Sequence, residues 1–215
     1  MKQPTLEQFL EKVKDHVLTI NLDQGLYRDI TIKKPGCTDA HYNITTRPGY
    51  LMLTGDMGSF VFTRLKDMFQ FFRDEDGYSI RPSYWEEKLE AVCSRDGAKE
   101  FDCEKIDEAL KEELSTFLED LDTNDEDDLE KIEAASEAVE NFINFTERDE
   151  WGYVTAIRDW NESDAGGLDL TDFWEHGTET WTYRYIWCCF AIVHAIKLYD
   201  QAKCRTHGSR KQVAA

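Results

Sequence analysis

The sequence lacks any apolar run of the roughly 20 residues that a membrane span needs. No apolar stretch follows its first residues, Met1-Lys2-Gln3-Pro4, so we expect no secretory signal. It has no P-loop, no G-x-G-x-x-G or G-x-S-x-G motif, and no C-x-x-C pair among its six cysteines. These absences predict a cytoplasmic protein with reduced thiols, and they leave nucleotide, serine-hydrolase and paired-cysteine zinc chemistry without a motif.

Positive charge is also scarce, because 25 lysines and arginines stand against 44 aspartates and glutamates, a net charge of −19. A protein that binds the phosphates of nucleic acid, or that lies on an anionic membrane surface, needs an excess of basic residues. We therefore expect neither nucleic acid nor a membrane as a direct partner. Apolar residues make up 41% and aromatic residues 13% of the 215 residues, which is enough for a folded core.

The acidic residues are concentrated in one segment of the chain. Residues 1–99 hold 15 acidic and 14 basic residues, and residues 151–215 hold 8 and 7. Residues 100–150 hold 21 acidic and 4 basic residues, a net charge of −17. Charge runs of this kind are often disordered linkers, so the spacing of the apolar residues within the segment decides its structure.

Those apolar residues recur at intervals of three and four, which is typical of amphipathic helices. The first stripe consists of Ile106, Leu110, Leu114, Phe117, Leu118 and Leu121. The second stripe consists of Leu129, Ile132, Ala135, Val139, Phe142 and Ile143. We predict an antiparallel pair of helices over 103–121 and 126–146, each roughly 30 Å long, with Asp102 capping the first.

Seventeen net charges over roughly 30 Å give about one charge per 1.7 Å, which is the linear charge density of duplex DNA. A stiff surface of this density would compete with DNA for a basic cleft. The carboxylates that we expect to form this partner-binding surface are Asp107, Glu108, Glu112, Glu113, Glu119, Asp120, Asp127, Asp128, Glu130, Glu133, Glu137 and Glu140. The alternative interpretation is a hairpin whose charged faces are merely solvated.

The N-terminal part alternates apolar and polar residues between glycine-containing turns, which predicts an antiparallel meander. Its four strands are expected at about 26–33, 41–46, 50–54 and 59–62. A capped helix running from Thr5 to Val17 precedes the meander, and helices over 65–72 and 83–92 follow and cover it.

Residues 180–202 form the most apolar segment and predict a buried C-terminal helix, with a short helix starting near Asp172. The expected fold class is α+β. We expect residues 151–215 to pack with residues 1–99 as one domain and the acidic hairpin, 100–150, to dock on it.

A second candidate site lies on the meander, where Arg47, Tyr50, Asp56 and Arg64 would bind a small ligand such as a nucleotide, or act on one. Metallophosphatases hold a metal with an aspartate in a Gly-flanked turn like Gly55-Asp56-Met57-Gly58, but their downstream Asn and His motifs are missing here, so we favour a plain turn. We assign no catalytic residue, metal ligand or cofactor. A third hypothesis is a structural or regulatory protein that oligomerises through the aromatic region 151–200.

The segment Arg47-Pro48-Gly49-Tyr50-Leu51-Met52-Leu53-Thr54-Gly55-Asp56-Met57-Gly58-Ser59-Phe60-Val61-Phe62, followed by Asp67-Met68-Phe69-Gln70-Phe71-Phe72, resembles uncharacterised accessory proteins of tailed bacteriophages and prophages. Ile186-Trp187-Cys188-Cys189-Phe190-Ala191-Ile192 resembles the end of the same proteins. The resemblance implies a phage protein that works in a bacterial cytoplasm, and such small acidic proteins are often inhibitors of host defence.

Together with the charge, this gives the function that we expect: an inhibitor of anti-CRISPR or anti-restriction type, which binds a basic nucleic-acid-binding host protein through an acidic DNA-mimic surface.

Overall fold

The computed structural model describes residues 2–74, 77–94 and 97–211, and the chain divides into two compact units. Unit 1 comprises Met1–Lys99 and Trp181–Ala215, and unit 2 comprises Glu100–Thr180. The expected domain containing all of 151–215 is therefore divided, because residues 151–180 supply Tyr153, Ile157 and Phe173 to the hydrophobic core of unit 2.

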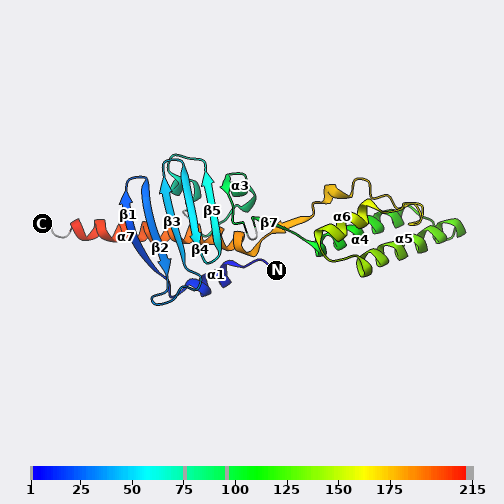
Figure 1. Cartoon of the computed structure of the whole chain (residues 1–215), viewed down its shortest axis with the longest axis horizontal. Helices are drawn as coiled ribbons and strands as arrows, with labels where there is room; N and C mark the ends of the chain where they lie inside the picture. Colours follow the sequence, from blue (N-terminus) through cyan, green and yellow to red (C-terminus); the bar gives the residue numbers. More distant parts are fainter. Residues whose placement is uncertain (1, 75–76, 95–96, 212–215) are drawn as a thin grey trace. The chain divides into compact units, whose positions relative to one another are not determined.

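Unit 1 is built on a six-stranded antiparallel sheet with the strand order β1-β2-β3-β4-β5-β6 (Figure 1). The strands are β1 Val17–Gln24, β2 Tyr27–Lys33, β3 Tyr42–Arg47, β4 Tyr50–Gly55, β5 Gly58–Thr63 and β6 Leu89–Ala91. The α+β class is confirmed, and the four predicted strands are β2 to β5. Strands β1 and β6 were missed.

Both missed strands overlap a predicted helix: β1 begins at Val17, the last residue of the first, and β6 lies within the helix predicted over 83–92. Helix α1, Leu6–Val13, begins with a capping box at Thr5 and ends at Val13, so Val17 opens β1 rather than closing the helix. The β-branched and apolar run Val17-Leu18-Thr19-Ile20 favours a strand once the chain has turned. Similarly, α3, Pro82–Glu86, is one short helix, and the next residues pair with β5 as β6.

The β4–β5 hairpin turns at Gly55-Asp56-Met57-Gly58, and its glycines have structural reasons. Gly55 and Gly58 both have positive φ, and a Cβ on Gly55 would lie 2.3 Å from the carbonyl oxygen of His41. The carboxylate of Asp56 accepts a hydrogen bond from the backbone N–H of Ala40 at 2.9 Å. Asp56 is thus used within the turn itself.

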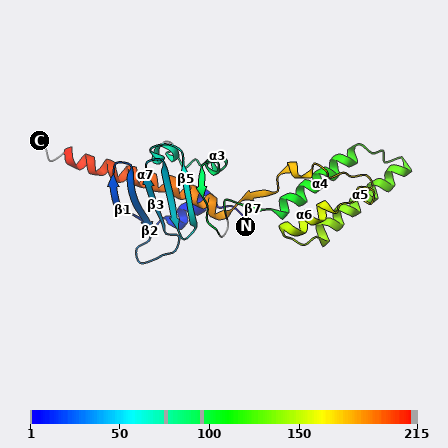
Figure 2. The ribbon, with the colours of Figure 1, turned by 45° about the horizontal axis from the view of Figure 1, so that its top comes forward.

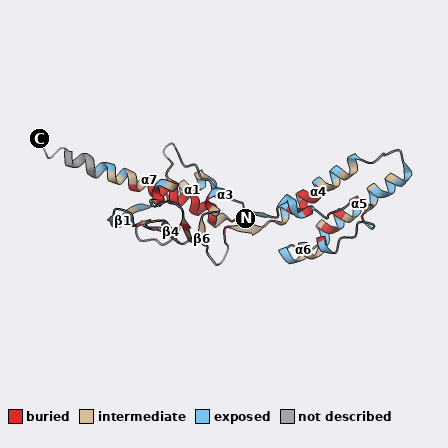
Figure 3. Cartoon of the chain, turned by 90° about the horizontal axis from the view of Figure 1, so that it is seen from above, coloured by how far each residue is buried: buried red, intermediate tan, exposed pale blue. Residues whose placement is uncertain are grey.

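One face of the sheet is covered by helices. The buried side chains of β2 to β5 alternate with more exposed neighbours, so only one face carries the core. Helix α7, Tyr183–Lys211, crosses that face, and α1 and α2, Met68–Phe72, pack beside it (Figures 1 and 3). The predicted buried C-terminal helix is confirmed, with Trp187 among its fully buried residues.

Unit 2 is mainly helical (Figure 2). Its elements are α4 Cys103–Glu119, α5 Glu126–Phe145, α6 Glu150–Arg158 and the 3-10 helix η1 Phe173–His176. The chain enters and leaves the unit through two short paired strands, β7 Lys99–Phe101 and β8 Glu179–Trp181. The predicted helices over 103–121 and 126–146 are confirmed as α4 and α5, and the short helix near Asp172 is η1.

Within the described residues, no helix combines the length and the apolar character that crossing a bilayer requires.

Candidate functional site

The division into two units separates the charge of the chain more strongly than the division into residues 1–99, 100–150 and 151–215 did. Unit 2 contains 28 acidic and 5 basic residues, a net charge of −23. Unit 1 contains 16 acidic and 20 basic residues, a net charge of +4. The acidity therefore belongs to one separately folded body, which makes unit 2 the candidate functional site.

Unit 2 owes its order to a core of its own. Ile106 and Leu110 of α4 and Ala135, Val139 and Phe142 of α5 are buried together, as the apolar spacing of both helices requires. Residues from α6 and from the 165–173 segment complete this core, so the apolar stripes are covered within unit 2.

Local hydrogen bonds fix where the two helices begin. The side chain of Asp102 caps α4 by accepting from the N–H of Lys105, and Asp125 caps α5 by accepting from the N–H of Asp127. Between the helices, the N–H of Asp122 donates to the carboxylate of Asp128 at 3.0 Å. The carboxylates in these positions are structural and hold the connection between the helices in one conformation.

Most of the predicted partner-binding carboxylates are exposed. The exposed ones belong to Glu108, Glu112, Glu119, Asp120, Asp127, Glu130, Glu133, Glu137 and Glu140. Two others are partly buried and paired within unit 2: Glu113 contacts the imidazole of His176, and Asp128 accepts from Lys131 at 2.7 Å.

Asp107 is a correction to the predicted surface, because it is buried. Its carboxylate accepts from the phenol of Tyr153 at 2.7 Å and from Arg148 at 2.9 Å. Burial and the hydrogen bond to Asp107 raise the pKa of the Tyr153 phenol. Asp107 lies three residues before Leu110 and so shares its face of α4, which places the carboxylate toward the core and leaves it unavailable to a partner.

Helix α5 carries a continuous row of carboxylates. Glu126, Glu130, Glu133, Glu137 and Glu140 recur at steps of four and three, so at about 100° per residue they share one face of the helix. All five are exposed, and none forms an ion pair with a described residue. We call these five residues the α5 stripe. Glu126 was not among the predicted residues, although the same spacing would have included it.

The dimensions of the α5 stripe resemble those of a nucleic-acid strand. Its ends are 14 residues apart, about 21 Å along the helix, which gives roughly one carboxylate per 5 Å. One strand of duplex DNA carries a phosphate per about 3.4 Å of axis. Glu104, Glu108 and Glu112 form a second exposed row on α4. The sequence reasoning counted the charges of this segment but did not use their alignment.

Two aromatic side chains of unit 2 are almost fully exposed. Phe145, at the end of α5, is 81% exposed, and Trp151, in the first turn of α6, is 74% exposed. Aromatic side chains that solvent surrounds to this extent are typical of protein contact surfaces, where they act as anchors. Periodicity could not single them out, because neither lies on a core stripe.

The second candidate site is not assembled as one cluster. Arg47 stacks on the ring of Tyr50, 3.7 Å from its centroid, where β3 meets β4, and exposed Arg64 follows Thr63, the β5 partner of Tyr50. Asp56 lies beyond the other end of β4, roughly 17–20 Å away along a six-residue strand. The structure therefore brings three of the four residues to one end of the sheet and leaves the acid at the other.

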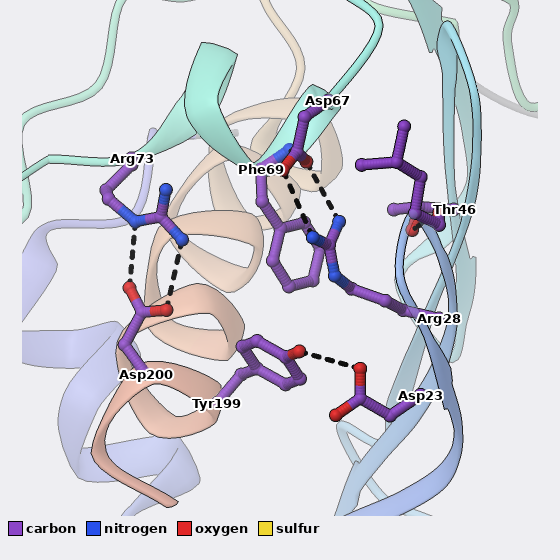
Figure 4. Close-up of polar contacts among 9 residues, drawn as sticks. Asp23, Arg28, Thr46, Asp67, Phe69, Arg73, Tyr199 and Asp200 are labelled. Carbon is purple, nitrogen blue, oxygen red and sulfur yellow. Dashed lines mark hydrogen bonds and ion pairs between the residues drawn. The ribbon is translucent and has the colours of Figure 1, made fainter. Parts of the chain in front are cut away.

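A polar cluster between the sheet and α7 was not predicted (Figure 4). Arg28, buried on β2, forms two hydrogen bonds to Asp67, at 2.8 and 3.1 Å, and its guanidinium lies over the ring of Phe69. Burial opposes the charge of Asp67, but the hydrogen bonds and charge of Arg28 outweigh it and hold the pKa of Asp67 below its usual value.

The same cluster joins α7 to Arg73, the C-cap of α2, and to Asp23 of the sheet. Arg73 donates two hydrogen bonds to Asp200, and the phenol of Tyr199 donates to Asp23 of β1 at 2.8 Å. Each of these charged groups has its partner within unit 1, so we interpret the cluster as structural.

The cysteines are free thiols, and burial raises the pKa of Cys188 and Cys189. In the part of the chain that the structure describes, no three His, Cys, Asp or Glu side chains are grouped so as to hold a metal ion. Comparison with known proteins gives no match to a family model, a curated protein or a solved structure.

Proposed function

We propose that this protein is a phage-encoded inhibitor of a bacterial defence system, and that it binds a basic nucleic-acid-binding protein of the host through unit 2. The bound surface is the cleft that the host protein uses for DNA or RNA, so the inhibitor acts as a nucleic-acid mimic in the bacterial cytoplasm. Restriction and CRISPR effectors are the class of partner with such a cleft. The inhibitor itself makes no contact with nucleic acid.

The observation that carries the proposal is the α5 stripe, five aligned and exposed carboxylates without internal counter-charges. A basic cleft recognises regularly spaced negative charge on a stiff support, and a helix with a packed core provides that support. The backbone of a folded helix needs no ordering on binding, so the stripe loses less conformational entropy than a flexible acidic tail would.

The cost of this arrangement also supports a function. Like charges at i,i+4 on a helix destabilise it by about 0.2–0.5 kcal/mol per pair. The stripe contains four successive like-charge pairs, two at i,i+4 and two at i,i+3, which also face each other on a helix. Lys131, the one basic residue of α5, binds Asp128 rather than a stripe residue. A helix required only for solubility would alternate the signs of its charges.

The test compares three forms of the full chain in affinity capture from a bacterial lysate, followed by elution with duplex DNA. The first is the wild type, and the second carries Gln at all five positions of the α5 stripe. The matched control changes five exposed acids elsewhere in unit 2, as Glu147→Gln, Glu150→Gln, Glu162→Gln, Asp172→Asn and Glu175→Gln. Both variants lose the same net charge.

We expect the wild type and the control to retain the same nucleic-acid-binding proteins, duplex DNA to release them, and the stripe variant to retain none. Retention should also fall steeply with salt, because exposed charge pairs are screened. Equal retention by all three forms, or complexes that duplex DNA does not release, would refute the proposal.

A further inference from the structure

The sheet of unit 1 has one long edge that its own chain leaves open. Strand β1 has eight residues and, among the residues that the structure describes, pairs only with β2, so no described strand lies beside its outer N–H and C=O groups. The opposite edge, β6, has three residues. Only β1 is long enough to bind another strand along its length.

Strand β1 also lacks two of the devices that protect natural edges, lysine and proline, although it has a bulge and an inward-pointing charge at Asp23. Its sequence, Val17-Leu18-Thr19-Ile20-Asn21-Leu22-Asp23-Gln24, contains no lysine and no proline. The single charged residue, Asp23, has its carboxylate bound by Tyr199 and Lys203 of α7, at 2.8 and 2.6 Å. A bulge between Ile20 and Leu22 is the one irregularity.

Apolar side chains are exposed on both faces of this edge. Ile20 lies opposite Ile30, on the face covered by helices, and is nevertheless 37% exposed. Leu22 lies opposite Asp29, on the other face, and is 40% exposed, and Val17 is 54% exposed. A strand added at β1 would therefore bury apolar surface on both faces of the sheet and form main-chain hydrogen bonds with β1.

The helical layer extends beyond the sheet at this edge. Helix α7 contacts Asp23 of β1 through Tyr199 and Lys203 and then continues to Lys211, as Figures 1 and 2 show. The eight residues after Lys203 span about 12 Å, more than twice the spacing of about 4.8 Å between strands. An added strand would thus have a helix beneath it already.

Charge disfavours a contact between two copies of unit 2. Two copies of unit 2, each at −23, repel one another, whereas unit 1 carries only +4 and β1 presents no free charge. We propose that two copies of the chain associate by antiparallel pairing of β1 with β1 about a two-fold axis, forming a continuous twelve-stranded sheet. A two-fold pairing uses both β1 edges at once and leaves only the three-residue β6 strands at the two ends of the sheet.

The test is the mass of the full chain in solution by analytical ultracentrifugation, from about 1 to 100 μM. We expect a monomer–dimer equilibrium that shifts toward the dimer in about 1 M salt, because the salt screens the repulsion between the acidic units. The proposed contact with a host protein shifts the other way with salt, so the two proposals fail independently.

The decisive variant is Leu22→Lys, which places two like charges near the two-fold axis and should weaken the dimer at least about tenfold. Leu65→Lys is the matched control, because Leu65 is 43% exposed and lies outside the strands. Circular dichroism verifies that both variants fold. In the wild type, amides of residues 17–24 should gain protection from hydrogen exchange as the concentration rises.

A chain that stays monomeric at 100 μM in low and high salt would overturn the proposal, as would a dimer that Leu22→Lys and Leu65→Lys affect equally.

Discussion

The phenol oxygen of Tyr42 lies 2.6 Å from Nδ1 of His194, and both residues are buried between β3 and α7. Burial, followed by the nearby charge of His16, lowers the pKa of His194 to about 4, and burial holds the pKa of Tyr42 well above its usual value. At neutral pH a neutral phenol and a neutral imidazole therefore share this hydrogen bond.

This pair predicts that unit 1 loses stability in mild acid. The folded pKa of His194 lies below the unfolded value of 6.5, so the unfolded state binds the proton more readily. The stabilisation is complete above pH 6.5 and is lost as the pH falls toward 4, by about 3 kcal/mol in total. His194→Asn keeps a hydrogen-bond partner for Tyr42 but does not titrate, so it should remove the contribution of His194 to the pH dependence in this window.

Hydrogen exchange of the β2 to β5 amides between pH 7 and 4 measures the effect in unit 1 alone. His41→Asn serves as the control, since it leaves the buried pair intact and should retain the pH dependence. If His194→Asn and the wild type lose the same stability across this window, the assignment to His194 is wrong.

A second prediction concerns the ion pair of Arg28 with Asp67. Asp67→Asn keeps the N-cap of α2, where the side chain accepts from the N–H of Phe69, but removes the charge opposite Arg28. An uncompensated buried guanidinium costs about 3–5 kcal/mol, so denaturant unfolding should show a loss of that size. Asp15→Asn disrupts the exposed pair with Lys34 and should cost less than about 1 kcal/mol. Equal losses would contradict the distinction between the buried and exposed pairs.

The third prediction separates the two neighbours Asp107 and Glu108. Asp107→Ala deprives the buried phenol of Tyr153 of its acceptor and should destabilise unit 2 by about 1–3 kcal/mol. Glu108→Ala, one residue further along α4, changes an exposed carboxylate and should stay within about 0.5 kcal/mol. Exchange of the α4 and α5 amides reports both values. A surface role for Asp107 would instead make the two variants alike.

The fourth prediction is that the α5 stripe reduces the stability of unit 2. Replacing all five glutamates by Gln removes four like-charge pairs and should stabilise α5 by roughly 1–2 kcal/mol at low salt. Because salt screens the same repulsion, the gain should shrink in about 1 M salt. The readout is again amide exchange in α5, and a stripe variant that is less stable than the wild type at low salt would contradict this interpretation.

Local patterns in the sequence were sufficient for much of this protein. The three-and-four spacing of Ile106, Leu110, Ala135 and Val139 located α4 and α5, because a helix is stabilised by contacts within one or two turns and by one apolar face. The alternation of apolar and polar residues and the glycine-containing turns located β2 to β5, because these signals also lie within each short segment. Counting the charged residues was enough to find that the acidic side chains are concentrated in residues 100–150.

Tertiary structure decided what depends on distant residues. Strand β1 exists because Val17–Gln24 finds β2 to pair with, and β6 because Leu89 and Ala91 reach β5. The burial of Asp107 depends on Tyr153, 46 positions away. Residues 151–180 belong to the acidic unit because they pack against α4 and α5 and complete its core. Packing between segments this far apart in the chain cannot be inferred from the local pattern of either segment.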